Sequence, residues 1–145
     1  MTVLLDMEEG LELEPQAIFA RVERVLAALE LDPAAELSLV ICGDETIAAL
    51  NQQWLGRTGP TNVLSWAQGE GQGAGPAPRL LGDVVVSAET AAREAAEHGL
   101  EPDEHLMRLI IHGILHLLGY EHEQGGEPAR QMEELTEELL ERSAS

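Results

Sequence analysis

The 145-residue sequence has no lysine, one cysteine and very few aromatic residues. With Cys42 as its only thiol, no internal disulfide can form, and we interpret Cys42 as a small buried residue of a protein in the reducing cytoplasm. No segment reaches the roughly 20 apolar residues of a membrane-spanning helix, and the N-terminus lacks the basic start of a secretory signal. The sequence therefore predicts a cytoplasmic protein that does not enter the membrane and has an aliphatic core.

The charge balance is strongly acidic. Asp and Glu total 27 against eight arginines, for a formal net charge of −19. Such a chain repels phosphate backbones at long range, so binding to DNA is not expected. Most of the glutamates fall in predicted helices, where a solvated face accommodates them.

Apolar patterns along the chain predict both strands and helices. Strands are expected at 2–6, 37–42, 62–66 and 81–87. The first strand-helix-strand unit implies a parallel pair, and the last two strands can pair antiparallel. We therefore expect a single domain over residues 1–145, of α+β class. One mixed four-stranded sheet would pack with about five helices.

Local signals indicate where the helices begin and end. Asp44 is expected to cap one helix, Pro15, Pro102 and Pro128 to open others, and Gly119 to end one as a left-handed cap. The Gly- and Pro-rich residues 69–79 predict an exposed loop without a phosphate-binding pattern. The inward side chains of the helix that follows Asp44 are predicted to be Ile47, Leu50 and Trp54.

One segment carries the spacing of a metal site: His112-Gly-Ile-Leu-His116-Leu-Leu-Gly119-Tyr-Glu-His122. Residues four apart on a helix differ by about 40° in direction and about 6 Å in height, so two imidazoles can reach one ion. Gly119 lets the chain turn back, and His122 can supply a third nitrogen. Three imidazoles leave a fourth tetrahedral position open, which is typical of catalytic zinc. We predict one zinc ion held by His112, His116 and His122.

The alternative is that these are ordinary histidines on an amphipathic helix. The aliphatic residues around His112 and His116 would desolvate an unpartnered imidazole at a real cost, which favours the metal. His105 lies about 10 Å away along the helix axis, and His98 lies at the end of another predicted helix. We interpret both of these as structural.

Two families share this histidine arrangement. Metzincin proteases use His-Glu-x-x-His-x-x-Gly-x-x-His, with the Glu as general base. The predicted metal helix resembles theirs, but Gly113 occupies the Glu position. The sequence more closely resembles the bacterial YbeY-type rRNA maturation factors, whose motif is His-Gly-x-Leu-His-Leu-x-Gly-Tyr-Asp-His, with Glu121 here in place of Asp. Further matches are Leu50-Asn51, Pro60-Thr61-Asn62-Val63-Leu64-Ser65-Trp66 and Leu81-Gly82-Asp83.

The resemblance implies a zinc-dependent endoribonuclease that cleaves single-stranded RNA. It further implies a role in maturation of small-subunit ribosomal RNA and in ribosome quality control, with small ribosomal subunit proteins as partners. It also implies a mixed four-stranded sheet and one zinc ion. Two rival functions are a metzincin-like metalloprotease, against which Gly113 counts, and a non-catalytic ribosome assembly factor that zinc merely stabilises.

The histidine motif does not identify the phosphate-binding residue or the general base. The family commonly has an arginine at the position of Leu55, and the nearest arginine here is Arg57. We expect Arg57 to bind a phosphate bidentately, with a solvated loop arginine as the alternative. No general base is identified. Glu121 or Asp83 could orient a metal ligand.

Overall fold

The computed structural model describes residues 2–67, 80–120 and 126–144. Within these ranges the chain forms four strands and five helices. In chain order they are β1 (Thr2–Met7), α1 (Pro15–Ala28), β2 (Glu36–Cys42), α2 (Asp44–Leu55), β3 (Val63–Ala67), β4 (Leu80–Ser87), α3 (Ala88–His98), α4 (Pro102–Leu117) and α5 (Gly126–Ser143). The predicted loop at 69–79 lies outside the described residues.

The strands form one mixed sheet in the order β1-β2-β4-β3. β1 pairs with β2 and β2 with β4 in parallel, whereas β3 pairs with β4 antiparallel. The α+β class, the mixed four-stranded sheet and both predicted pairings are thereby confirmed. Among the described residues β3 forms one edge of the sheet and β1 the other.

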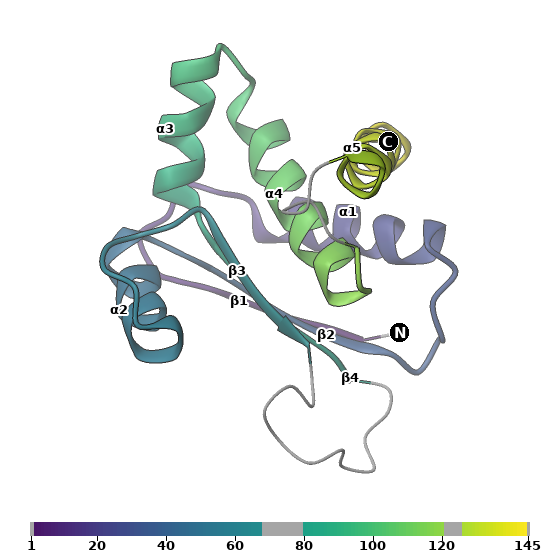
Figure 1. The fold of residues 1–145 in the computed structure, drawn as a ribbon, viewed down its shortest axis with the longest axis horizontal. Helices are drawn as coiled ribbons and strands as arrows, with labels where there is room; N and C mark the ends of the chain where they lie inside the picture. Colours follow the sequence, from purple (N-terminus) through teal and green to yellow (C-terminus); the bar gives the residue numbers. More distant parts are fainter. Residues whose placement is uncertain (1, 68–79, 121–125, 145) are drawn as a thin grey trace.

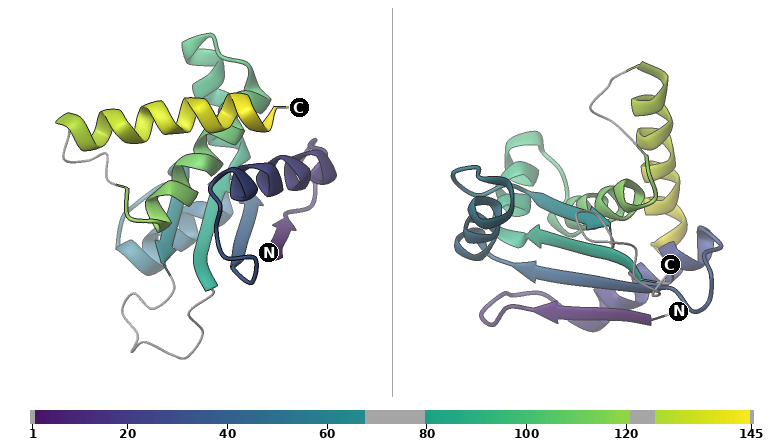
Figure 2. Two further views of the ribbon diagram at one scale, coloured as in Figure 1. Left: turned by 90° about the vertical axis from the view of Figure 1, so that its right-hand side faces the viewer. Right: turned by 60° about the horizontal axis from the view of Figure 1, so that its bottom comes forward.

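Helices lie on both faces of the sheet. α1, α4 and α5 lie on one side of it and α2 on the other, while α3 stands at the end of the strands (Figures 1 and 2). None of the helices in the described part of the chain is both long and apolar enough to cross a membrane. The core between the sheet and α1 and α4 is aliphatic, as the composition predicts. Its fully buried side chains include Val22, Leu26, Leu37, Leu39, Ile41, Ile110, Ile111 and Ile114.

The start of α2 corrects one prediction. Asp44 does not cap this helix: Gly43 is the N-cap residue and makes no side-chain cap bond. The backbone N–H groups of Gly43 and Asp44 instead donate to the carboxylates of Glu8 and Glu89, at 2.9 and 2.7 Å. Two long carboxylates from other elements therefore replace the expected local cap. The Asp44 carboxylate forms an ion pair with Arg93, whose guanidinium lowers the pKa of that carboxyl to about 2.

The other predicted helix ends need smaller changes. Gly119 follows α4 with a φ of +97°, as predicted. α5 begins at Gly126, two residues before Pro128. Cys42 is buried at the end of β2, as predicted, and its burial raises the pKa of the thiol to about 11.

The side chain of Trp54 overturns a second prediction. On α2, the side chain of Ile47 is buried as predicted, but that of Trp54 is 60% exposed. Its ring stacks on that of Trp66, with centroids 6.0 Å apart. The small apolar cluster beneath α2 consists of residues around Ile47 and Val85, with Trp66 at its margin. The apolar periodicity of α2 extends beyond the part of the helix that lies over the core. Trp54 therefore stacks on the ring of Trp66 at the surface instead of entering the core.

Candidate metal centre and active site

Helix α4 carries His112 and His116 one turn apart in its C-terminal half. The helix ends in a Schellman motif: the N–H of Gly119 donates to the carbonyl of His116, and that of Tyr120 to the carbonyl of Leu115, at 3.0 and 3.1 Å. His112 is half-buried and His116 is exposed, whereas most of the residues between and before them are buried. The two imidazoles therefore lie at the border between the core and solvent.

Gly113, which lies between them, sets how closely α4 approaches the sheet. A Cβ atom at this position would lie 2.8 Å from Cγ1 of Val84 and 3.3 Å from Cγ2 of Val63. The position where metzincin proteases carry their catalytic Glu thus faces β4 and has no space for a side chain. The peptidase alternative lacks both the base and the room for it.

Ser65 on β3 fixes the orientation of His116. The Ser65 hydroxyl and His116 Nδ1 form a hydrogen bond of 2.9 Å. A bond at Nδ1 holds the ring and leaves Nε2 as the nitrogen available to a metal ion, as is common for histidine ligands. Sequence reasoning did not assign Ser65 a role, although it lies in the Pro60–Trp66 segment on which the family resemblance rests.

A cavity of about 700 Å³ opens beside His112. Its walls come from the segment leading into β3, from α4 and from α5, and they include Arg57 and Arg108. The guanidinium of Arg108 binds both carboxylate oxygens of Glu137, at 2.8 and 3.2 Å, and lowers the pKa of that carboxyl. Arg57 is exposed and makes no ion pair among the described residues. The structure thus places the predicted phosphate-binding residue in the same cavity as His112.

Asn51 holds the loop that carries Arg57. The side chain of this buried residue donates from Nδ2 to the Gly59 carbonyl at 3.0 Å. The backbone carbonyl of Asn51 accepts the N–H of Arg57 at 3.3 Å. The Leu50-Asn51 match of the sequence therefore has a structural explanation. Both bonds fix the backbone around Arg57 while its side chain stays exposed.

A second hydrogen-bonded group, formed by His105, Glu94 and Asn62, links helices α3 and α4 to the start of β3. His105 Nε2 lies 2.9 Å from the Glu94 carboxylate, and Asn62 Nδ2 donates to the same carboxylate at 3.2 Å. Asn62 also accepts the backbone N–H of Val63 at 2.7 Å, at the start of β3. His105 is thus a structural histidine, as predicted, and it connects α3 and α4 to the segment that leads into β3.

Asp83 does not face His112 or His116, which corrects a third prediction for these two predicted ligands. Val84 faces α4 through its contact at Gly113. Side chains alternate along a strand, so Asp83 points to the opposite face of the sheet, away from His116. The other candidate for this role, Glu121, lies outside the described residues.

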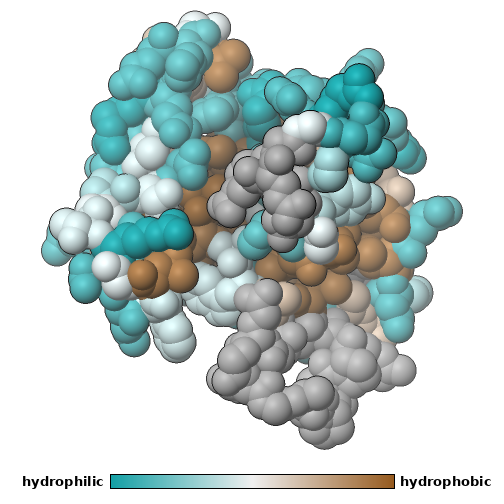
Figure 3. All heavy atoms as spheres, in the orientation of Figure 1, coloured by the Kyte–Doolittle hydropathy of each residue, from teal (hydrophilic) through white to brown (hydrophobic). Residues whose placement is uncertain are grey.

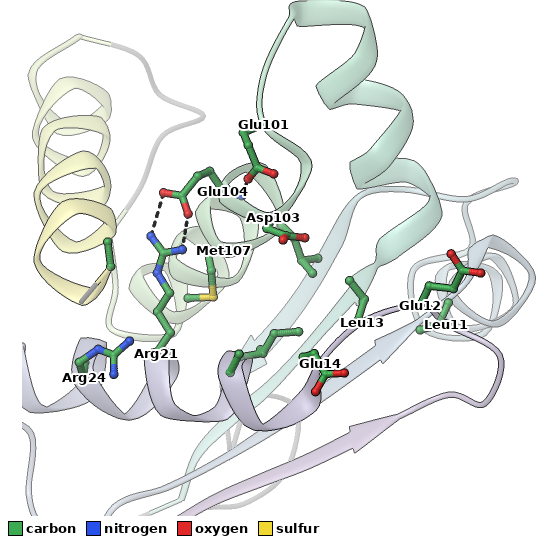
Figure 4. A pocket seen from close by; sticks show the side chains of 14 residues that line it. Leu11, Glu12, Leu13, Glu14, Arg21, Arg24, Glu101, Asp103, Glu104 and Met107 are labelled. Carbon is green, nitrogen blue, oxygen red and sulfur yellow. Dashed lines mark hydrogen bonds and ion pairs between the residues drawn. The ribbon is translucent and has the colours of Figure 1, made fainter.

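A larger cavity of about 940 Å³ lies at the other end of α4. Figure 4 shows its carboxylates, with Arg21 directed at Glu104. Five acidic side chains line this cavity against two arginines, and both arginines are hydrogen-bonded within the protein. Such a surface repels phosphate, so the smaller cavity at His112 is the candidate site for a nucleic acid.

The donor set fits a metal ion as far as the structure describes it. His112 and His116 share one helix, and the bond from Ser65 leaves Nε2 of His116 available. The third predicted ligand, His122, lies outside the described residues. Within residues 2–67, 80–120 and 126–144, no three His, Cys, Asp or Glu side chains are grouped to hold a metal.

The mixed sheet, with His112 and His116 one turn apart on α4 and a cavity beside His112 that carries two arginines and two glutamates, fits the predicted class of a metal-dependent hydrolase. Residues 6–144 match the family model described as endoribonuclease YbeY, and the chain belongs to this family. Membership confirms the predicted family and the predicted enzyme class, a metal-dependent endoribonuclease acting on RNA.

Curated relatives named endoribonuclease YbeY agree with this assignment. The protein from Geobacter metallireducens is 48% identical over 119 residues, which span 81% of this chain and 79% of the relative. That from Syntrophotalea carbinolica is 51% identical over 111 residues, which span 76% and 74% of the two chains. The solution structure of TM1509 from Thermotoga maritima superposes with a TM-score of 0.68, covering 99% of this chain and 89% of that one. At 24% identity this structural likeness supports the fold alone.

Proposed function

We propose that the chain acts, as one hydrolase domain over residues 1–145, as a zinc-dependent endoribonuclease in the cytoplasm. Its substrate would be single-stranded RNA, and its role the maturation of small-subunit ribosomal RNA and ribosome quality control. The observation that carries the proposal is the placement of His112 and Arg57 on one cavity, next to a His116 ring that Ser65 orients.

His112, His116 and His122 would hold the zinc ion. When bound there, zinc would supply Lewis-acid chemistry to the phosphodiester. The residues of the chain contribute orientation. Ser65 holds the His116 ring at 2.9 Å, and the close contact of Gly113 with Val84 keeps α4 at a fixed distance from the sheet.

Arg57 would bind the scissile phosphate. A guanidinium offers two parallel N–H donors to phosphate oxygens, and those donors favour the extra charge of the pentacovalent transition state. Arg108 lies on the same cavity but is neutralised by Glu137. Arg57 is therefore the cation that the described cavity walls offer to a substrate.

The first experiment combines metal analysis with RNA cleavage by the purified protein. We expect about one zinc per chain and cleavage of a labelled single-stranded RNA. Cleavage should be lost with a chelator, return with zinc, and fail on the same RNA annealed to its complement. Protein that cleaves RNA equally well after complete metal removal would refute the zinc mechanism, and cleavage of both RNA forms would refute the single-strand preference.

The proposed recruitment by small ribosomal subunit proteins rests on the charge of the chain. With a net charge of −19 and no lysine, we expect one or two phosphate contacts and a slope of roughly −1 to −2 in the logarithmic salt dependence of RNA binding. Free RNA should bind weakly and small subunits tightly. A salt titration of both complexes tests this, and equal affinity for the two targets would contradict recruitment through proteins.

A further inference from the structure

Two of the few aromatic side chains form an exposed stack at the edge of the sheet. Trp54, in the last turn of α2, lies over Trp66 of β3 with ring centroids 6.0 Å apart and an interplanar angle of 25°. We propose that the outer face of Trp54 is a stacking platform for one nucleobase of the single-stranded RNA substrate. This inference rests on the proposed function and adds a base-binding subsite to it.

The exposure of Trp54 is the first argument. The side chain is 60% exposed, and its neighbour Leu55 is 51% exposed. The other large exposed apolar residues of the described chain, Leu4 and Leu100, lie singly on β1 and after α3. Figure 3 also shows apolar surface over α2, and a larger apolar area below α5, over α4 and α1. Adjacent exposed apolar side chains commonly mark a binding surface.

The position of the stack relative to the histidines is the second argument. Trp66 directly follows Ser65, the residue that holds His116. Because side chains alternate along β3, Ser65 faces α4 and Trp66 faces α2. The platform and the predicted metal centre therefore lie on opposite faces of a single edge strand, and Arg57 follows Trp54 by three residues. An RNA strand that crosses this edge would contact both.

The edge itself offers hydrogen-bonding groups along that path. The N–H of Ser87 donates to the carbonyl of Asn62 at 2.9 Å. Bonded and non-bonded pairs alternate in an antiparallel ladder, so the pair Ser65–Val84 is a non-bonded one. The backbone N–H and C=O of Ser65 then point away from β4, toward a ligand that passes over the edge.

The chemistry of the platform favours a base rather than a phosphate. Asp83 pairs in register with Trp66 on the same face of the sheet, and its negative charge would repel phosphate. An uncharged base stacks on an aromatic ring without that penalty, and stacking tolerates any base because each has a π-face. Trp66 supports the inner side of Trp54, so the outer ring is already held in place.

The test uses zinc-loaded full-length protein and a short single-stranded oligoadenylate. We expect Trp54→Leu to raise KM about 5- to 100-fold, the usual effect of losing one base–aromatic stack, with kcat near wild type because the contact is remote from the phosphate. Trp54→Phe should recover most of the loss. Leu4→Ala, an exposed apolar residue at the opposite edge, is the matched control and should cleave like wild type.

A second measurement changes the RNA, and its first readout comes from the wild-type protein. In a series of the same RNA with one abasic nucleotide at a time, one position should raise the wild-type KM and should not raise that of Trp54→Leu. If wild type cleaves RNA but neither the abasic series nor Trp54→Leu changes KM, the platform is refuted and the surface serves another partner, such as a protein. If wild type does not cleave RNA at all, the proposed function fails instead.

Discussion

The two ends of helix α4 face two cavities and hold their polar side chains in opposite ways. At the N-terminal end, Glu101 caps the helix, Glu104 accepts from both terminal nitrogens (Nη1 and Nη2) of Arg21, and His105 binds Glu94. At the C-terminal end, His116 makes one bond to Ser65, and Arg57 makes no ion pair among the described residues.

The difference separates residues that stabilise the fold from residues that are available for chemistry. A polar group whose partners are all within the protein adds stability but offers nothing to a substrate. The two histidines each make one side-chain bond, but Nδ1 of His105 is buried without a partner, whereas the exposed His116 ring can offer Nε2 to a ligand. The same residue types, histidine and arginine, therefore have different expected roles at the two ends of one helix.

The largest expected effect, on zinc binding and RNA cleavage, distinguishes His116 at the C-terminal end of α4 from His105 at its N-terminal end. His116→Ala should lose zinc and lower RNA cleavage by more than the about 10²–10³-fold that loss of one transition-state donor costs. His105→Ala should keep both zinc and cleavage but lose about 1–3 kcal/mol of stability with its bond to Glu94. Elemental analysis, cleavage rates and thermal unfolding of both variants check this. Unchanged zinc in His116→Ala would remove it from the ligand set.

The two arginines of the site cavity provide the next comparison. Arg57→Ala should lower kcat/KM by about 10²–10³-fold with normal zinc content and melting temperature. Arg108→Ala breaks a partly exposed pair with Glu137 and should change stability by at most about 1 kcal/mol, with a much smaller effect on cleavage. Similar cleavage losses in the two variants would indicate a general effect of cavity charge instead of a phosphate contact by Arg57.

The Ser65 bond should have an intermediate effect on the metal. Ser65→Ala leaves the His116 ring without its 2.9 Å partner, and we expect zinc affinity to fall about 10–100-fold, as for other partners of metal ligands. Ser65 is half-buried, so the melting temperature of the zinc-free protein should change little. Competition with a chromophoric chelator measures the affinity. Wild-type affinity in the variant would mean that the ring is held by other contacts.

The smallest expected effect concerns the pH dependence of the N-terminal end. Arg21 lowers the pKa of the Glu104 carboxyl. The pair therefore stabilises the fold above the ordinary glutamate pKa of about 4.3, and this stability is lost as the pH falls through the lower folded-state pKa. Glu104→Gln should cost at most about 1 kcal/mol at neutral pH, since the carboxyl is partly exposed. Urea unfolding at several pH values should show the difference vanish in acid; a constant difference would assign it to packing.

Most of the fold could be predicted from the sequence because it depends on local patterns. Aliphatic runs and the prolines at helix starts place the strands and helices to within a few residues, and the parallel β1–β2 pair follows from its crossover helix. The capping of α2 could not be predicted, because Glu8 and Glu89 come from distant segments. Neither could the exposure of Trp54, since periodicity gives the direction of a side chain but not the extent of the core beneath it.

In the site, too, local patterns could predict residues on one element but not contacts between distant segments. The histidine spacing predicts His112 and His116 as metal ligands because both fall on one helix, and Arg57 is predicted to bind phosphate because basic residues are so scarce. The bond between Ser65 and His116 joins residues 51 positions apart, so no local pattern contains it. Asp83 was proposed to orient a metal ligand because the three consecutive valines that follow it do not show which face of β4 meets α4.

The close contact at Gly113 has a consequence for how such enzymes can diverge. A mutation to glutamate at this position is the step that would give the helix a peptidase motif. Here the first atom of the new side chain would already lie 2.8 Å from Val84, so the protein would lose stability before it gained a general base. Smaller residues on β3 and β4 would have to appear first, with no benefit to RNA cleavage. The packing at this glycine thereby closes to this chain the single substitution that would give α4 the peptidase motif.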